Sequence, residues 1–187
     1  SLYMTVYIAK TLVRLQTLLG QGAFDNDQTS QLLKHAFTFL DTRIAREVIE
    51  MKKYEKKNKT TLFPSDDLCD YLYTNALAKR PTTADITYLI DRLAKKPTDL
   101  TIYGKANTAV ILAQYGKTDL AKEYLKSLKE YTVATKEMGR YFDSRNAYYS
   151  WRNYKIPTEV AAIEALKALS PSDNYIKEMQ KWLLQEK

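Results

Sequence analysis

The stretch that decides the fold is Ile156-Pro157-Thr158-Glu159-Val160-Ala161-Ala162-Ile163-Glu164-Ala165-Leu166. Pro157 suits the first turn of a helix, because it has no N–H to lose there, and Glu159 puts a negative charge near the positive end of the helix dipole. Small apolar side chains occupy more than one face of the turns that follow, which indicates a helix enclosed by several neighbours. Ser170-Pro171 ends it, because proline cannot continue the hydrogen-bond ladder.

The next segment is helical in a different way, with apolar residues on one face only. Ile176, Met179 and Leu183 stand at helical spacing, which predicts an amphipathic helix. The same pair of helices occurs earlier in the chain. A small-residue helix ends at Tyr115-Gly116, and an amphipathic helix opens at Thr118. We therefore predict antiparallel helical hairpins, in which enclosed inner helices alternate with half-exposed outer helices, arranged as a toroid or a solenoid.

Helical periodicity also dominates the first half of the chain. The pattern predicts a helix over 2–19, ended by Gly20, and further helices after Ser65 and before Pro97. A long helix between them carries one apolar stripe at steps of three and four residues: Leu33, Phe37, Leu40, Ile44, Val48 and Met51. Strand-like alternation is nearly missing, and only 140–143 is predicted to be extended, paired with Tyr148-Tyr149. The sequence thus predicts an all-α fold.

Composition sets limits on the classes of protein to consider. The chain has 187 residues, of which 45% are hydrophobic, so its length favours one domain over 1–187 with a sizeable core. No apolar run is long enough to cross a bilayer, and we expect no membrane insertion. The net charge is +7, but the one dense basic run, 52–59, is interpreted as a solvated helix end. We expect no nucleic-acid partner.

Several short stretches together carry a family resemblance. In the second half they are Met138-Gly139-Arg140-Tyr141, Tyr148-Tyr149-Ser150-Trp151, Ile156-Pro157-Thr158-Glu159 and Trp182-Leu183-Leu184-Gln185-Glu186-Lys187. In the first half they are Ser1-Leu2-Tyr3-Met4-Thr5-Val6-Tyr7-Ile8, Phe39-Leu40-Asp41 and Asp70-Tyr71-Leu72-Tyr73. In this order they resemble the helical thioester domain of the bacterial members of the α-macroglobulin family.

The resemblance implies a fold and a function. It implies the later part of an α/α toroid, within a large protein of the cell envelope, periplasm or extracellular space that traps proteases. The implied partners are proteases and the other domains of the parent protein. Because the earliest hairpins of the toroid would precede Ser1, the first helix and Trp182-Leu183-Leu184 are expected to expose an apolar patch. Self-association of a second copy through that surface is then expected.

The chemistry of the family points away from catalysis by this chain. Its thioester forms between the Cys and Gln of a Cys-x-Glu-Gln motif, whereas Cys69 stands in Leu68-Cys69-Asp70-Tyr71. Cys69 is therefore predicted to be a buried, inert thiol. His35 is the only histidine, which excludes sites that need two. It is interpreted as an exposed helical residue, with an accessory role in acyl transfer as the alternative.

Two other classes of function remain open. A toroid glycosidase would use two acids from Asp143, Glu159 and Glu164, and a helical-repeat adaptor would bind peptides in a concave groove. The aromatic run offers either a protein-contact surface or internal packing, with these candidate residues: Tyr141, Tyr148, Tyr149 and Trp151. We predict a binding or structural module that is not an enzyme, with no catalytic, cofactor-binding or metal-binding residues.

Overall fold

The computed structural model describes residues 1–20, 27–95, 100–143 and 155–186. The chain divides into two compact units, 1–96 and 97–187, which we call unit 1 and unit 2. Helices hold 75% of the described residues, and the sheet found among them has two strands. The all-α prediction is confirmed. The prediction of one domain over 1–187 depends on how the two units are assembled with each other, and it stays a prediction.

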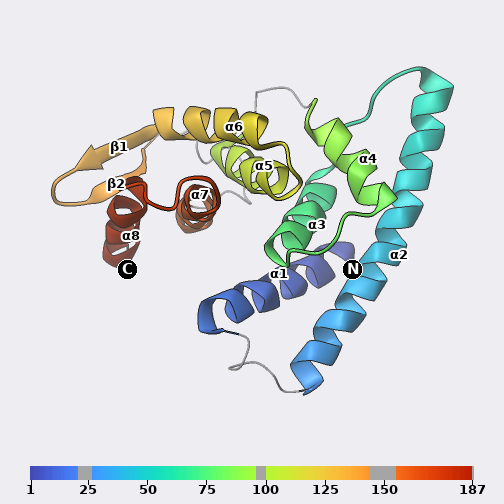
Figure 1. Cartoon of the computed structure of the whole chain (residues 1–187), viewed down its shortest axis with the longest axis horizontal. Helices are drawn as coiled ribbons and strands as arrows, with labels where there is room; N and C mark the ends of the chain where they lie inside the picture. Colours follow the sequence, from blue (N-terminus) through green and yellow to red (C-terminus); the bar gives the residue numbers. More distant parts are fainter. Residues whose placement is uncertain (21–26, 96–99, 144–154, 187) are drawn as a thin grey trace. The chain divides into compact units, whose positions relative to one another are not determined.

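In the part of the chain described, unit 1 is built from four helices, of which the long α2 runs along one side (Figure 1). Their bounds are α1 Leu2–Leu19, α2 Asp27–Asn58, α3 Asp66–Leu77 and α4 Ala84–Leu93. α1 packs against α2 and α3, and α4 packs against α2. The predicted stripe of α2 faces this core, since Phe37, Leu40, Ile44 and Val48 are all buried.

Local signals set the ends of these helices. The Ser1 hydroxyl accepts a hydrogen bond from the Met4 N–H, and α1 ends at Gly20, whose φ is 78°. The Ser65 hydroxyl accepts a hydrogen bond from the Leu68 N–H and caps α3. A side-chain acceptor at the N-cap satisfies backbone N–H groups that a helix leaves unpaired, and the positive φ of Gly20 turns the chain out of the helix at no steric cost to glycine. The predicted bounds of α1 are therefore confirmed.

Unit 2 contains two helical hairpins and a small sheet (Figure 1). The elements are α5 Ile102–Gln114, α6 Thr118–Glu130, β1 Thr132–Thr135, β2 Gly139–Phe142, α7 Lys155–Leu169 and α8 Tyr175–Gln185. α5 packs against both α6 and α7, and α7 packs against α8. Short connections join α5 to α6 and α7 to α8, so each pair runs antiparallel.

The alternation of inner and outer helices holds in unit 2. α5 is buried along nearly its whole length, and α7 buries residues on several faces. α6 and α8 bury one face each, through Leu125 and Leu128 in α6 and through Ile176 and Met179 in α8. The hairpins are thus as predicted, while their closure into a toroid stays a prediction.

The strand pairing differs from the prediction. β2 does extend over part of 140–143, but its partner is β1, with Val133 opposite Tyr141 and Thr135 opposite Gly139. The expected partner, Tyr148-Tyr149, lies outside the described residues. Gly139 has φ 82°, and a Cβ there would meet the Glu178 carbonyl oxygen of α8. Glycine is therefore required by both the backbone angle and the close approach.

Two further expectations need correction. Trp182 is only 2% exposed, because it stacks on Tyr141 with ring centroids 6.0 Å apart. It therefore cannot belong to an exposed apolar patch, although Leu184 beside it is exposed, as are Tyr3, Met4, Tyr7 and Ile8 on α1. Cys69 is half-buried and not buried, with its Sγ 3.7 Å from the Pro64 carbonyl oxygen. Among the helices described, none is long and apolar enough to cross a membrane.

Candidate functional site

A groove of about 500 Å³ lies in unit 1, between α2 and the segment that leads into α3. Its apolar lining comes from Met51, Tyr54, Leu62, Phe63 and Leu68, and its charged rim comes from Arg43, Arg46, Glu47 and Glu50 of α2. We call this feature the α2–α3 groove. Its volume lies within the range of about 300–1,000 Å³ that is typical of ligand pockets.

The lining of the groove leaves aromatic surface open to solvent. Leu68 is buried at its base, whereas Tyr54 is 52% exposed and Phe63 is 40% exposed. Large aromatic side chains that are half-open at a groove favour contact with another apolar side chain, because covering them removes apolar surface from water. The groove is therefore suited to binding a bulky apolar group.

A single carboxylate fixes the segment that forms one wall of the groove. Glu55 of α2 accepts hydrogen bonds from the Leu62 N–H at 2.8 Å, from the Tyr88 hydroxyl at 2.8 Å and from Arg92 Nη2 at 2.8 Å. The hydrogen bond from Arg92 is the main cause that lowers the pKa of Glu55 to about 2. Glu55 thus ties α4 and the chain before α3 to α2.

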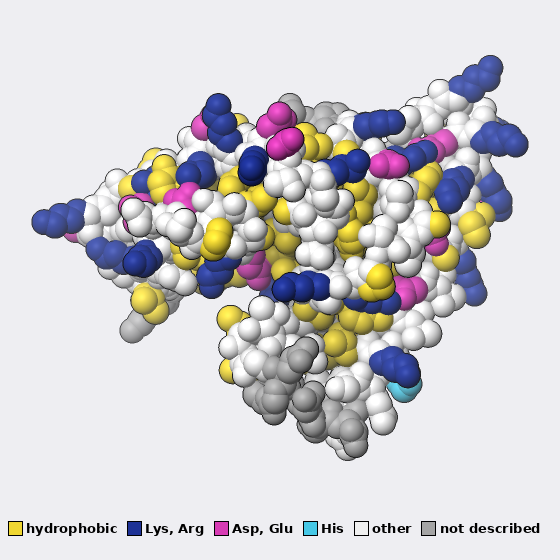
Figure 2. Space-filling view, in the orientation of Figure 1, with side chains coloured by type: hydrophobic (Ala, Val, Ile, Leu, Met, Phe, Trp, Pro, Cys, Tyr) yellow, Lys and Arg dark blue, Asp and Glu magenta, His cyan; other side chains and the backbone are white. Residues whose placement is uncertain are grey.

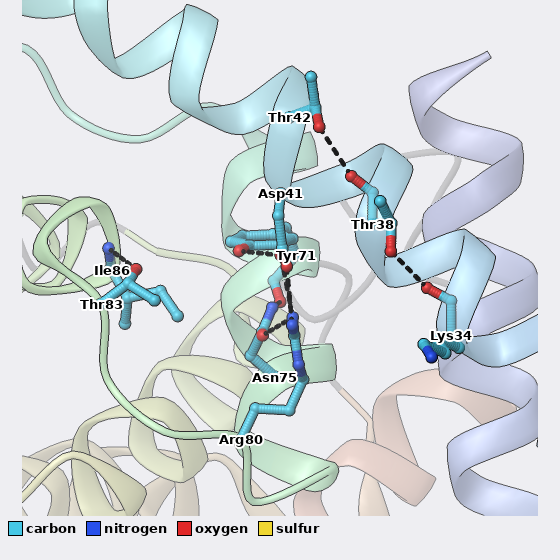
Figure 3. Close-up of polar contacts among 9 residues, drawn as sticks. All are labelled: Lys34, Thr38, Asp41, Thr42, Tyr71, Asn75, Arg80, Thr83 and Ile86. Atoms are coloured by element: carbon cyan, nitrogen blue, oxygen red, sulfur yellow. Dashed lines mark hydrogen bonds and ion pairs between the residues drawn. The ribbon is translucent and has the colours of Figure 1, made fainter.

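A second carboxylate holds α2 to α3 (Figure 3). Asp41 accepts hydrogen bonds from the Tyr71 hydroxyl at 2.8 Å and from both terminal nitrogens of Arg80, at 2.9 and 2.7 Å. Burial alone would raise the pKa of Asp41, but the hydrogen bonds from Arg80 and Tyr71 outweigh it and leave the pKa below its usual value. Asn75 accepts a further bond from Arg80. These contacts make Asp41 a structural carboxylate.

The charges on the rim of the groove are not all paired. Arg43 Nε lies 3.5 Å from Glu47 Oε1, and Lys53 Nζ lies 2.8 Å from Glu50 Oε1. Arg46 is exposed and has no hydrogen-bond or ion-pair partner among the described residues. It also lines a second hollow of about 400 Å³, beside Leu2 and Phe39. The guanidinium of Arg46 therefore borders both the α2–α3 groove and this second hollow.

The predicted protein-contact residues are placed only in part. Tyr141 lies on β2, half-buried against Trp182. Tyr148, Tyr149 and Trp151 lie outside the described residues, so the choice between a contact surface and internal packing stays a prediction for them.

Glu159 occupies an unusual position for a carboxyl. It is 0% exposed near the start of α7, and neither oxygen has a hydrogen-bond partner at normal distance in the described part of the chain. Burial raises the pKa of Glu159 to about 8, and the nearby Phe142 backbone N–H opposes this rise only in part. A carboxyl enclosed in this way does not lie in the open cleft that a glycosidase needs. The other two candidate acids differ from it, since Asp143 is exposed and Glu164 is half-buried.

The remaining candidates lie at the surface or are isolated. His35 is exposed on α2, and Figure 2 shows it at the molecular surface. Lysines at the C-terminal end of α2 are exposed as well, as predicted for a solvated helix end. Within the described ranges, no group of three or more His, Cys, Asp and Glu residues is placed to hold a metal ion.

The residues that define the groove carry little signal in the sequence pattern. Arg46 looked like any charged residue on the outer face of α2. Glu55 did carry a signal, because it is the one acid inside the basic run 52–59. The Glu55 side chain is only 11% exposed and pairs with Arg92, which explains why an acid stands within a basic run.

Comparisons with known proteins leave the family unassigned. No family model matches the chain, no curated protein matches it, and no solved structure matches it.

Proposed function

We propose that this chain is a helical, non-catalytic module of an α-macroglobulin-like protein that traps proteases. The proposal comes from the short stretches that resemble the thioester domain of that family. It includes the toroid, the protease partners and the location in the envelope or outside the cell, all of which the resemblance implies.

One observation carries most of the support. Three of the stretches that bear the resemblance fall on β2, on the start of α7 and on the end of α8, and these elements pack against one another. Tyr141 stacks on Trp182, and Arg140 Nε donates a hydrogen bond to Glu178 Oε2 at 2.6 Å. Residues separated by about forty positions in the sequence thus form one packed cluster.

The alternation of helices gives further support. An inner helix that is buried on several faces, followed by an outer helix that buries one face, is the repeating unit from which α/α toroids are built. α5 with α6 and α7 with α8 have this arrangement.

The test uses the complete parent protein. We expect a Cys-x-Glu-Gln motif or its degenerate remnant upstream of Ser1, preceded by β-sandwich domains. Where the Cys and Gln are present, a small amine should attack the thioester carbonyl and release the cysteine thiol, which a thiol reagent detects. A parent protein without β-sandwich domains, which leaves an added protease fully accessible to large substrates, would contradict the proposal.

A helical adaptor is the second candidate, because the α2–α3 groove is an opening with exposed aromatic walls. An adaptor should bind peptides as the isolated chain, without any upstream domain. A protease-trapping module should need the other domains of its protein, so this experiment separates the two candidates.

A further inference from the structure

We propose that the α2–α3 groove binds a peptide segment in which a bulky apolar side chain stands next to an aspartate or glutamate. The apolar side chain lies between Tyr54 and Phe63, over Leu68, and the carboxylate pairs with Arg46. This inference does not depend on the family proposed above.

The aromatic walls determine the apolar part of the ligand. Tyr54 and Phe63 are both half-open, and Met51 and Leu62 continue the apolar lining between them. The volume of about 500 Å³ accommodates one large side chain with adjoining backbone. Bases also stack on exposed aromatic rings, but a nucleic acid brings one negative charge per nucleotide to a rim that already holds Glu47 and Glu50. It is therefore the poorer fit, although the chain carries a net charge of +7.

The rim charges determine the acidic part of the ligand. Glu47 and Glu50 are each neutralised by a basic neighbour on α2, through Arg43 and Lys53. Arg46 remains with its guanidinium exposed, and its planar group matches a carboxylate through two parallel hydrogen bonds. The basic run that ends α2, 52–59, adds a field of the same sign. The partner is therefore acidic and not basic.

The groove is held in shape before any ligand arrives. Glu55 fixes the Leu62 backbone to α2, and Asp41 fixes α3 to α2 through Tyr71 and Arg80. A preformed site loses less conformational entropy on binding, which lets a short peptide bind.

The experiment measures binding of labelled synthetic peptides to the full chain by fluorescence anisotropy. The probe contains a Leu-Phe pair flanked on both sides by Asp-Glu. One comparison peptide replaces the acids by lysines, and another replaces Leu-Phe by serines. We expect saturable binding of the probe, and binding weaker by about tenfold or more for either comparison peptide.

Matched variants locate the binding. Arg46→Glu and Phe63→Ala should each weaken binding of the probe by about tenfold. Lys34→Glu makes the corresponding charge change on the same helix, about 18 Å away along its axis, and Ile49→Ala truncates an exposed apolar residue of α2 that does not line the groove. Both controls should bind as the unmodified chain does. Circular dichroism should show the same helix content in all four variants.

Several results would overturn the inference. These are an absence of saturable binding up to about 1 mM peptide, equal losses for Arg46→Glu and Lys34→Glu, and tighter binding of an oligonucleotide that the same variants abolish. Concentration-dependent self-association that Phe63→Ala removes would assign the groove to a second copy instead. None of these results bears on the family proposed above.

Discussion

Burial of Glu159 should make the fold less stable as the pH rises, and replacing Glu159 by glutamine should remove this pH dependence. The carboxyl is 0% exposed, and its pKa rises from 4.5 to about 8 because burial disfavours the charged form. The folded state therefore holds a proton that the unfolded chain releases above pH 4.5. Stability contributed by this proton is complete below pH 4.5 and is lost as the pH rises towards 8.

The magnitude follows from the pKa difference. A difference of one in pKa corresponds to about 1.4 kcal/mol, so this group alone makes the folded state about 3 kcal/mol less stable at pH 7 than at pH 4. Glutamine is neutral at every pH and close to the same size. The variant should thus match the unmodified chain at pH 4 and become more stable than it by up to about 3 kcal/mol at pH 7.

Urea denaturation followed by far-UV circular dichroism measures this difference. The free energy of unfolding is determined for both chains at intervals from pH 4 to pH 9. Subtracting one curve from the other cancels the contributions of all other titrating groups. A difference that does not change with pH would refute the reasoning, because it would show that Glu159 has the same pKa in the folded and unfolded states.

The other predictions concern single contacts, each checked by urea denaturation. Glu55→Gln should destabilise the fold by about 1–3 kcal/mol near pH 7. Because the pKa of Glu55 is lowered to about 2, that loss should shrink as the pH falls below 4.5, and a loss unchanged at pH 3 would contradict it. Gly139→Ala should destabilise by clearly more than Gly116→Ala, since both glycines have φ 82° but only at Gly139 would a Cβ meet the backbone of α8. Equal effects would argue against that close approach. Leu40→Ala should cost about 2–5 kcal/mol, because Leu40 is fully buried in the core of unit 1, and a cost below about 1 kcal/mol would place it outside the core.

The sequence alone determined the helices and most of their ends. Ser65, Gly20 and Gly116 act within one turn of their own position, through caps and left-handed backbone, so their effect can be read locally. The apolar stripe of α2 was predictable for a related reason, because helical spacing alone decides which residues share a face.

Only the tertiary structure decided which partners meet. Arg80 reaches Asp41 and Arg92 reaches Glu55 across nearly forty residues, and nothing in the sequence near one partner identifies the other. The partner of β2 was chosen in the same way, since a strand can pair with any extended neighbour that packing brings alongside it.

The raised pKa of Glu159 and the unpaired charge of Arg46 also depend on tertiary packing. The composition around Glu159 suggested a first-turn carboxylate stabilised by the helix dipole, yet enclosure by neighbouring elements makes it a buried acid with a raised pKa. Arg46 is notable only because its neighbours on α2 are already paired and the chain before α3 is folded back beside it. Burial and charge pairing depend on every element that surrounds a side chain, and the sequence specifies those surroundings only through the complete fold.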